Sequence, residues 1–385
     1  MIPRVNIPRF FHKALRQPFY ALRVGWKRLE AYRCFIRGSG PAPAPESVTL
    51  FLTHRCNLRC RMCGQWGESG VTKHVLPAEL KEELTPEVMD DLIEQFKIFK
   101  PNVTLFGGEP LLYGKIIPLI RKLKAAGLHL LMITNGSLLS QYAPELAGSG
   151  IDEINLSLDG DEELHDRIRE HPGLFRKIAE GVESIQRLKR ESGKKKPLVN
   201  LQCTINQWNY RQLERLAAVA KALDADSLTF HHLIYLSEGV YRKQEEVFYD
   251  DFGCDSPGWK GFLFSPGIDP AVLIPKIREV KRRVRGIPVD FYPAFGDKEI
   301  TEYYTNPDFR SRSYSAHCLS PWTCGYVFSD GSVKPCLNLP YVFGNIREER
   351  FLEIWNGEKA GNFRRRLKER KNYPACFRCT EFYRY

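Results

Sequence analysis

The stretch Thr53-His-Arg-Cys56-Asn-Leu-Arg-Cys60-Arg-Met-Cys63 directly follows a short apolar run at residues 48–53. Three cysteines spaced Cys-x3-Cys-x2-Cys on one loop are able to surround a single centre, and thiolates prefer zinc or iron–sulfur. A structural zinc needs four ligands, and His54 is available as the fourth. A cubane cluster held by three cysteines leaves one iron open to a small ligand. The spacing favours the cluster and leaves the zinc site as an alternative.

The apolar run at 48–53 is the first of six, and helical patterns separate them. Such an alternation predicts a parallel sheet, either open or partly closed as a barrel, and in both forms the site lies at the carboxyl ends of the strands. We expect strands near 48–53, 103–106, 128–133, 153–158, 198–205 and 227–234. We expect helices near 85–99, 113–126, 140–148, 162–192, 209–222 and 271–286.

Polar and special residues occur where these strands are predicted to end. Glycines at 107 and 108 allow the backbone to approach a ligand closely, and Glu109 beside them is able to accept a hydrogen bond from an ammonium group. An ordinary strand-to-helix turn is the alternative. The strand ends read Gly107-Gly108-Glu109-Pro110, Thr134-Asn135-Gly136, Ser157-Leu158-Asp159-Gly160 and Thr204-Ile205-Asn206.

A second group of cysteines lies near the carboxyl terminus of the sequence. Clustered cysteines in a reducing compartment indicate metal binding or catalysis more often than disulfides. Asp330-Gly331, between two apolar runs, predicts a hairpin, so two thiols flank a hairpin and two more close a cage. A four-thiolate iron–sulfur centre and a zinc ribbon both fit this pattern. The five cysteines are Cys318, Cys324, Cys336, Cys376 and Cys379.

The positive charge is concentrated at the start of the chain. The net charge is +11, and residues 1–40 hold nine Lys/Arg and one acid, which leaves +3 for the rest. A nucleic-acid binder shows a basic, aromatic stripe on its body, so an RNA-modifying enzyme is only an alternative here. Apolar residues at 11, 15, 19, 22, 26 and 29 fall on one helical face. Such a helix either lies on an anionic membrane surface or packs on the body.

No apolar run approaches the roughly 20 residues of a membrane span, and no apolar core of signal-peptide type is present. The alternating prolines after Ser39 predict a stiff, extended linker over 39–46. The sequence therefore favours a cytoplasmic protein, with contact to the inner face of the membrane as the role that the basic segment leaves open.

Together, the cysteine triad and the Gly-Gly-Glu-Pro turn resemble the radical SAM superfamily over about residues 47–236. The resemblance implies that Cys56, Cys60 and Cys63 bind three irons of a 4Fe–4S cluster whose fourth iron takes the amino and carboxylate groups of S-adenosylmethionine. One departure is Met62, where an aromatic residue with its backbone facing the adenine is usual. The other cofactor-binding residues implied are Gly107, Gly108 and Glu109 for the methionine ammonium, Ser157 and Asp159 for the ribose, and Asn135 and Asn206 at the rim.

Two further features resemble the superfamily branch with SPASM or twitch extensions. One is the segment from Ser157 to Arg169, with its His-Asp-x-Ile-Arg pattern, in which we expect His165 to pack rather than catalyse. The other is the C-terminal cysteine pattern over about residues 316–385. This resemblance implies one auxiliary 4Fe–4S cluster, since a full SPASM domain carries seven cysteines and this chain has five. The implied ligands are Cys318, Cys336, Cys376 and Cys379, with Cys324 able to replace one of them.

The resemblance also implies an α/β fold: a partial (β/α)6 TIM-type barrel with a small C-terminal auxiliary Fe–S domain. The implied enzyme takes an electron from a donor such as flavodoxin or ferredoxin, cleaves S-adenosylmethionine to a 5′-deoxyadenosyl radical and abstracts hydrogen from a peptide, sugar or lipid-linked substrate. The expected parts are a basic amphipathic arm (1–38), a Pro-rich linker (39–46), the radical SAM core (47–236), a lid insert with a connecting α/β segment (237–315) and the SPASM/twitch-like domain (316–385).

Overall fold

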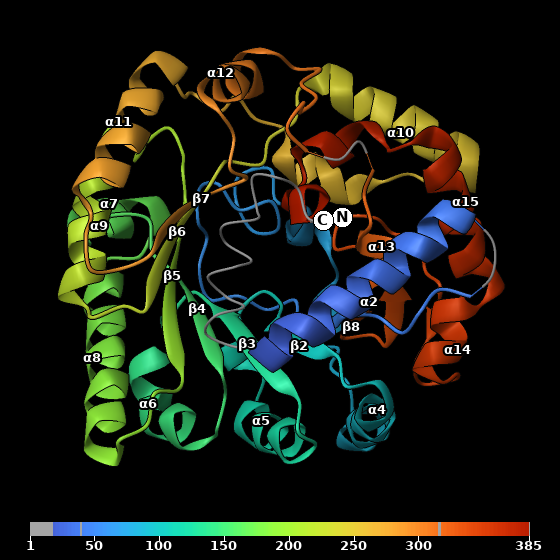
Figure 1. Ribbon diagram of the computed structural model, residues 1–385, viewed down its shortest axis with the longest axis horizontal. Coiled ribbons are helices and arrows are strands. Elements are labelled where there is room, and N and C mark those ends of the chain that lie inside the picture. Colours follow the sequence, from blue (N-terminus) through green and yellow to red (C-terminus); the bar gives the residue numbers. More distant parts are fainter. Residues whose placement is uncertain (1–17, 39–40, 315–316, 385) are drawn as a thin grey trace.

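The computed structural model describes residues 18–38, 41–314 and 317–384. Its strands form one sheet in the order β10-β9-β8-β1-β2-β3-β4-β5-β6-β7, in which β1 to β7 run parallel. The sheet curves around a central space and ends at β10 and β7 (Figure 1). The predicted α/β class and partial barrel are confirmed. The strands are β1 (Ser47–Phe51), β2 (Asn102–Phe106), β3 (His129–Thr134), β4 (Glu153–Ser157), β5 (Leu198–Thr204), β6 (Ser227–His231), β7 (Val289–Tyr292), β8 (Cys324–Phe328), β9 (Ser332–Lys334) and β10 (Gly344–Asn345).

Helices follow the strands and cover the outer face of the sheet (Figure 1). In the core they are α4 (Pro86–Phe99), α5 (Ile116–Ala125), α6 (Leu139–Gly148), α7 (Glu162–Arg169), α8 (Leu174–Ser192), α9 (Leu213–Ala222), α10 (Glu238–Phe252), α11 (Pro270–Arg283) and α12 (Asp297–Thr305). The flanking helices are α2 (Pro18–Arg37), α3 (Pro77–Leu80), α13 (Ser320–Thr323), α14 (Phe351–Asn356) and α15 (Glu358–Arg370). Short 3-10 turns are η2 (Val71–His74), η3 (Pro110–Leu112), η4 (Pro257–Phe262), η5 (Pro374–Arg378) and η6 (Thr380–Arg384).

The single helix predicted over 162–192 is wrong, because two helices occupy that stretch. α7 ends at Arg169, and the next residue, Glu170, has a left-handed φ of 54°. α8 starts at Leu174, directly after Gly173, which has a φ of 75°. Pro172 stands between them, and a proline disfavours helical geometry in the residue before it. The break turns the chain so that α7 stays at the carboxyl end of β4.

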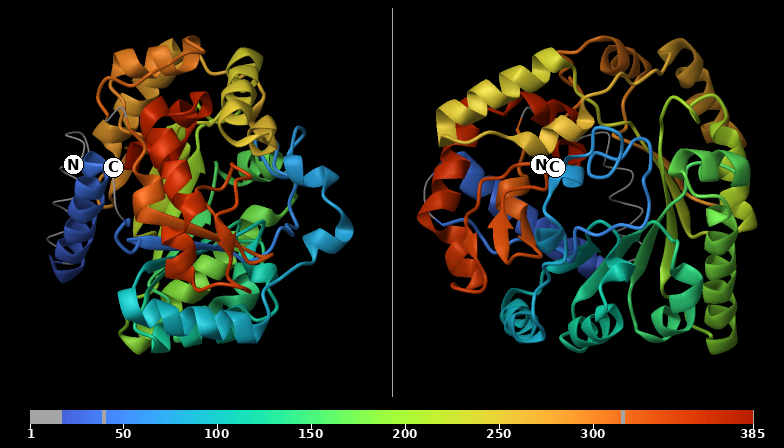
Figure 2. Two further views of the ribbon diagram at one scale, coloured as in Figure 1. Left: turned by 90° about the vertical axis from the view of Figure 1, so that its right-hand side faces the viewer. Right: turned by 180° about the vertical axis from the view of Figure 1, so that it is seen from behind.

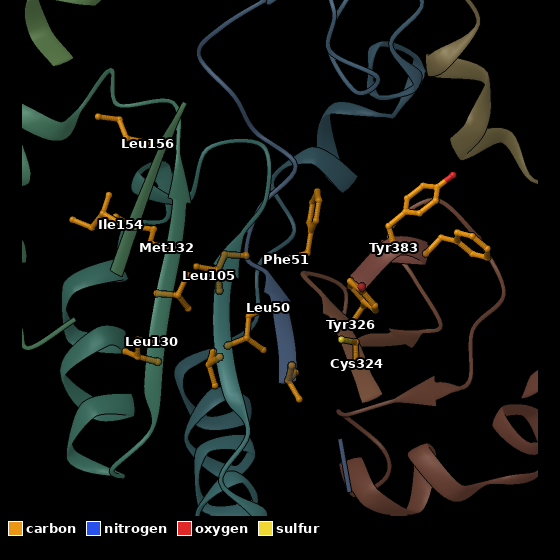
Figure 3. Packing of buried hydrophobic residues seen from close by; sticks show 14 of the residues in the cluster. Leu50, Phe51, Leu105, Leu130, Met132, Ile154, Leu156, Cys324, Tyr326 and Tyr383 are labelled. Carbon is orange, nitrogen blue, oxygen red and sulfur yellow. The ribbon is translucent and has the colours of Figure 1, made fainter. Parts of the chain in front are cut away.

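The core lies between the sheet and these helices. Alternate strand residues point outward and are fully buried, as Figure 3 shows for Leu50, Leu105, Leu130, Met132 and Leu156. Burying each such side chain stabilises the fold by about 1.5–3 kcal/mol. This layer fixes the strands, and so it fixes the loops that leave their carboxyl ends.

The C-terminal region extends the same sheet. β8 pairs parallel with β1, with Cys324 opposite Ser47, and β9 pairs antiparallel with β8. The hairpin predicted at Asp330-Gly331 is therefore confirmed, and Gly331 adopts the left-handed φ of 84° that its turn requires. The auxiliary region and the barrel share one hydrogen-bonded framework.

Helix α2 lies across the amino ends of β1 and β2. Arg28 pairs with Glu46, which precedes β1, at 2.7 Å, and Arg23 donates to Asn102 at the start of β2. Lys27 donates to the carbonyl oxygen of Phe99 at 2.8 Å. The cysteine loop lies at the opposite, carboxyl ends of the strands, so α2 and the candidate site occupy opposite sides of the barrel.

The apolar stripe predicted for this helix is not its packing face. The stripe positions Phe11 and Leu15 lie outside the described residues, whereas Leu22, Trp26 and Leu29 stand 72%, 59% and 41% exposed. The face that packs on the body instead consists of Val24, Ala31 and Phe35, each under 10% exposed. Among the described residues, no helix has the length and apolarity needed to cross a bilayer.

The Pro-rich segment after α2 is held against the C-terminal region. Asn356 accepts a hydrogen bond from the amide of Ala42 at 2.7 Å and donates to its carbonyl at 3.2 Å. The indole of Trp355 donates to the carbonyl of Pro43 at 2.9 Å. These bonds hold the extended linker against α14.

Candidate functional site

Backbone bonds join the cysteine loop to the turn after β2. The amide of Gly108 donates to the carbonyl of Thr53 at 2.7 Å, and the amide of Glu109 donates to the carbonyl of Arg55 at 2.8 Å. A Cβ on Gly108 would stand 2.2 Å from the Arg55 oxygen, and one on Gly107 2.6 Å from the Thr53 oxygen. Only glycine therefore permits this approach, which fixes where the loop leaves β1.

The three thiols of Cys56, Cys60 and Cys63 lie close together on this loop. Burial, together with the nearby charges of Glu109, Cys60 and Cys63, raises the pKa of Cys56 to about 12. The Cys56 thiol thus keeps its proton in the metal-free chain, and a bound metal displaces it because thiolates are the ligands of the metal.

Each thiol also has a hydrogen-bond donor of its own. The side-chain amide of Asn135 reaches Cys56 Sγ at 3.7 Å, and the Trp66 backbone amide reaches Cys63 Sγ at 3.4 Å. Donors of this kind stabilise negative charge on a sulfur-ligated cluster and so influence its reduction potential.

The third donor, Arg169, was not among the predicted site residues. Its Nη1 donates to Cys60 Sγ at 3.6 Å, and its Nε pairs with Asp159 at 2.6 Å while only 11% of the side chain is exposed. The available signal was the Arg that ends the His-Asp-x-Ile-Arg pattern. That pattern indicates helix packing, whereas the structure brings the guanidinium to the cysteine loop.

Glu109 is fully buried and joins the ends of β2 and β3. Its carboxylate accepts from Thr134 Oγ1 at 2.7 Å, from the Asn135 amide at 2.7 Å and from the Leu111 amide at 3.0 Å. These hydrogen bonds lower the pKa of Glu109, but the effect of burial is larger and raises the pKa to about 7. The carboxylate is therefore held rigidly beside the cysteine loop, and three of its acceptor positions are used by the protein itself.

The remaining predicted residues divide into two groups. Met62 and Asn206 line a cavity beside the cysteine loop. Asp159 lies 1% exposed behind it and uses its carboxylate on Arg169 and on the amide of Thr204. Ser157 ends β4 opposite Gln202 and is not among the residues that line the cavity.

The cavity has a volume of about 530 Å³, within the range of small-molecule sites. The cysteine loop forms one wall with Arg61 and Cys63, and the segment after β5 contributes Trp208. Arg61 stacks over the Trp208 ring at 5.5 Å and pairs with Glu170 at 3.0 Å. The cavity thus joins the thiols to a basic and aromatic opening.

Part of the predicted lid insert forms the opposite wall. Phe264 lines the cavity, and a Cβ on Gly261 would stand 1.9 Å from the carbonyl of Gly64. A Cβ on Gly258 would stand 2.4 Å from the carbonyl of Asn338, close in sequence to Cys336. This segment therefore packs between the cysteine loop and the C-terminal thiols.

Four C-terminal thiols form a second group. Burial, followed by the neighbouring thiols of Cys376, Cys379 and Cys336, raises the pKa of Cys318 well above its usual value. Burial and the neighbouring Cys336 likewise raise that of Cys376 to about 12. The side chain of Asn372 accepts from the Cys318 amide at 3.1 Å. The hairpin and η5 thus bring together four cysteines from three separate segments.

Cys324 and His54, two other candidate ligands, have different surroundings. Cys324 Sγ lies 2.9 Å from Ser47 Oγ across the β1–β8 pair and accepts from Arg384 at 3.5 Å, and Figure 3 shows it beside Tyr326. His54 packs against the rings of Phe51 and Phe328, which also stack on each other. Pairing of β1 with β8 accounts for the position of Cys324, and packing against the rings accounts for that of His54.

His165 has the packing role that we expected. Its ring is 0% exposed, and its Nδ1 accepts from the Asp159 amide at 3.1 Å. Burial, followed by the charge of Arg169, lowers its pKa well below the usual value. The neutral ring supports the strand end that also holds Asp159.

The donor chemistry of both thiol groups fits iron–sulfur clusters. In a zinc site all four ligands converge on one ion, whereas each thiolate of a cubane binds a different iron and stands further from the others. Within residues 18–38, 41–314 and 317–384, no three Cys, His, Asp or Glu side chains converge closely enough to ligate one ion. Three hydrogen-bonded thiols beside a two-glycine turn suit a cluster with one open iron.

Comparisons with known proteins agree with this chemistry. Residues 50–226 match the model of the radical SAM superfamily, and residues 318–380 match that of SPASM, an iron-sulfur cluster-binding domain. An AdoMet-dependent heme synthase of Methanosarcina barkeri is 27% identical over 330 residues, which cover 84% of each chain. A tungsten-containing aldehyde ferredoxin oxidoreductase cofactor-modifying protein of Pyrococcus furiosus is 24% identical over 86% of each chain.

A solved structure shares the fold. Streptococcus suis SuiB bound to precursor peptide SuiA superposes with a TM-score of 0.58 at 16% identity, covering 82% of this chain and 65% of that one. A radical SAM domain binds a 4Fe–4S cluster and S-adenosylmethionine, and a SPASM domain binds auxiliary iron–sulfur clusters. Residues 50–226 therefore form a radical SAM domain, and residues 318–380 form a C-terminal SPASM domain.

Proposed function

We propose that this enzyme abstracts hydrogen from a substrate held at the carboxyl end of its barrel. The supporting observation is the set of three thiols, Cys56, Cys60 and Cys63, each with its own hydrogen-bond donor. When bound, the cluster and S-adenosylmethionine supply reductive cleavage of a carbon–sulfur bond and a radical that removes hydrogen from carbon. The chain's own residues supply binding, orientation and exclusion of water.

We assign roles to these residues from their positions. Asn135 and Arg169 stabilise the negative charge that reduction adds at the thiolates. Gly107 and Gly108 bring main-chain groups against the cysteine loop, and Glu109, beside them, supplies its remaining acceptor position to the methionine ammonium. Met62 and Asn206 line the cavity, where we place the rest of the cofactor.

We assign the auxiliary cluster to Cys318, Cys336, Cys376 and Cys379. Four thiolates would leave no iron open, which favours electron transfer over substrate ligation. A cluster held by these residues would supply a site for the electron left on an oxidised substrate. The segment containing Gly258 and Gly261 contacts both thiol regions, so it is placed to cover a substrate lying between them.

We also propose a substrate class, a partner and a location for the enzyme. A peptide, sugar or lipid-linked molecule suits the open cavity, and the proteins named above include a heme synthase and a protein solved with a bound precursor peptide. A precursor of heme therefore joins this set of proposed substrates. The chain needs a reductant, for which we propose a flavodoxin or ferredoxin, and we propose a cytoplasmic location with contact to the inner membrane face through the arm.

Iron and sulfide analysis after anaerobic reconstitution tests the proposal. We expect about eight irons in the wild type and about four in Cys56→Ala/Cys60→Ala/Cys63→Ala. With dithionite and S-adenosylmethionine, the wild type releases 5′-deoxyadenosine and the triple variant does not. A variant that retains all of its iron would contradict the assignment, as would a wild type that binds only zinc.

A further inference from the structure

Exposed apolar side chains are concentrated on α2. Of the eight large hydrophobic side chains that stand exposed in the described residues, four belong to this helix: Leu22, Trp26, Leu29 and Ile36. Their spacing places them on one side, opposite the buried Val24, Ala31 and Phe35. Trp26 also donates its indole N–H to Glu30 at 2.8 Å, which leaves the ring lying along the helix surface.

The same side of the molecule is rich in basic residues. Exposed arginines at 23, 33 and 37 accompany the apolar side chains on α2. The loops that enter the parallel strands lie at this end of the barrel, and three of them carry further exposed cations. These are Lys100 before β2, Lys194, Lys195 and Lys196 before β5, and Arg282, Arg283 and Arg285 before β7.

Neither the helix dipole nor packing of α2 on the body explains both the basic and the apolar residues at this end of the barrel. Helices of the barrel end at this side, and cations near a helix C-terminus complement its dipole, so the loop charges alone carry no argument. The dipole does not explain Leu22, Trp26, Leu29 and Ile36 on an exposed face. A helix that only packed on the body would place such side chains inward and leave its polar face to solvent.

We propose that this end of the barrel, with α2 at its centre, is a docking face for an anionic membrane surface. Apolar residues interleaved with arginines suit the boundary between headgroups and acyl chains, and the surrounding cations suit anionic lipids. A second copy of the chain fits less well, because it would bring like charges together. RNA fits less well, because Leu and Ile side chains do not stack on bases.

The face has a defined orientation relative to the active site. In the left view of Figure 2, α2 lies at one side of the molecule, and the light-blue segment after β1 lies at the opposite side. A chain docked through α2 therefore holds its cavity away from the lipid. Substrate then enters from the aqueous side, even when the enzyme is on the membrane.

Flotation of the reconstituted holoenzyme with vesicles tests the docking face. We would compare phosphatidylcholine vesicles with vesicles containing about 30 mol% phosphatidylglycerol, at low and high salt. Leu22→Gln/Trp26→Gln/Leu29→Gln/Ile36→Gln removes the exposed apolar residues but keeps helix-forming side chains. The matched control, Leu76→Gln/Tyr249→Gln/Val342→Gln, removes exposed apolar residues from elsewhere.

We expect the wild type and the control to float with the anionic vesicles and to be released by salt, and the quadruple variant to partition at least about tenfold less. Equal flotation of the quadruple variant overturns the proposal, as does a wild type that binds neither vesicle. A wild-type dimer that the quadruple variant dissociates also overturns it, in favour of self-association. Iron content and 5′-deoxyadenosine release without vesicles test the chemistry separately.

Quenching by brominated lipids tests the orientation. Trp26 is one of six tryptophans, and the cavity contains Trp66 and Trp208. We expect quenching of the wild type by brominated anionic vesicles to disappear in Trp26→Phe, which remains apolar and still binds. Quenching that persists in Trp26→Phe would show that another side of the molecule meets the lipid.

Discussion

At the residue scale, Cys324 differs from the thiols that we assign to the auxiliary cluster, because contacts within the sheet hold its side chain. Its contacts are Ser47 and Arg384, whereas Cys376 lies near Cys336. We expect Cys324→Ser to retain about eight irons and Cys376→Ser to fall to about four. Iron and sulfide analysis of the two reconstituted variants makes the comparison. Loss of iron in Cys324→Ser alone would reverse the assignment.

His232 links stability to pH. It is 2% exposed, its Nδ1 lies 2.9 Å from Tyr304 Oη, and burial lowers its pKa to about 3. Since the unfolded chain binds this proton near pH 6.5, stability is fully present above that pH and is lost as the pH falls toward 3.

We expect the wild type to lose about 1.4 kcal/mol more than His232→Gln between pH 7.5 and 5.5, because one unit of that interval lies below the unfolded pKa. Unfolding midpoints of the reconstituted proteins measure the difference, with His171→Gln as the control. A parallel fall in wild type and His232→Gln would show that His232 is not the group responsible.

Site residues that are close together in the sequence were predictable, whereas contacts between distant residues were not. Cys56, Cys60 and Cys63 were predictable because their spacing is local, and so was the glycine turn at 107–108. The bond from Arg169 to Cys60 joins residues 109 positions apart, and no periodicity in the chain encodes it. The internal use of Asp159 was missed for the same reason, since its partner becomes visible only in three dimensions.

At the scale of elements, the turn after β2 sets the position of the cysteine loop. A Cβ on Gly108 would collide with backbone rather than with a movable side chain. We expect Gly108→Ala to weaken S-adenosylmethionine binding by about tenfold or more, since a displacement near 1 Å is costly at a reacting centre. Gly114→Ala is the control, because a Cβ there meets nothing within 4 Å.

Equilibrium dialysis of S-adenosylmethionine against the reconstituted variants gives the result. Iron content is measured in parallel, so that weaker binding is distinguished from a lost cluster. Equal affinity in Gly108→Ala and Gly114→Ala would mean that the close approach of the two loops does not position the cofactor.

Element types were largely predictable, whereas their faces and interruptions were not. The six strands follow the apolar runs because buried strands need such runs. The break at Glu170 depends on one residue with left-handed backbone angles, which the periodicity of apolar residues does not predict. The stripe on α2 was recognised correctly as apolar, yet periodicity alone does not specify which side of a helix meets the body. Arg28, paired with Glu46, is part of that choice.

At the scale of the whole molecule, the linker couples the barrel to the C-terminal region. Asn356 makes two bonds to Ala42, and their loss leaves main-chain groups unsatisfied at a cost of about 1–3 kcal/mol. We expect Asn356→Ala to lower the unfolding midpoint and to speed proteolysis within 41–46. Asn362→Ala is the control, because half-buried Asn362 on α15 accepts a hydrogen bond from the side chain of Arg365. Unchanged cleavage in Asn356→Ala would show that the linker is held by packing alone.

The arrangement of the sheet was the least predictable feature. A hairpin at Asp330-Gly331 follows from its sequence, but the pairing of β8 with β1 depends on a partner 277 residues away. Short apolar strands pair with many partners equally well. The choice is made by the complete fold, which places Cys324 opposite Ser47.

That pairing also has a consequence for synthesis on the ribosome. β1 is made early and gains β2 on one side, but its other edge waits for β8. At about 5–20 residues per second, 277 residues correspond to roughly 15–55 s. Throughout that interval a nascent chain presents an open strand edge, which is a template for unwanted pairing between chains. Slow decoding between the two strands would therefore lower the yield of folded enzyme without altering a single contact of the finished protein.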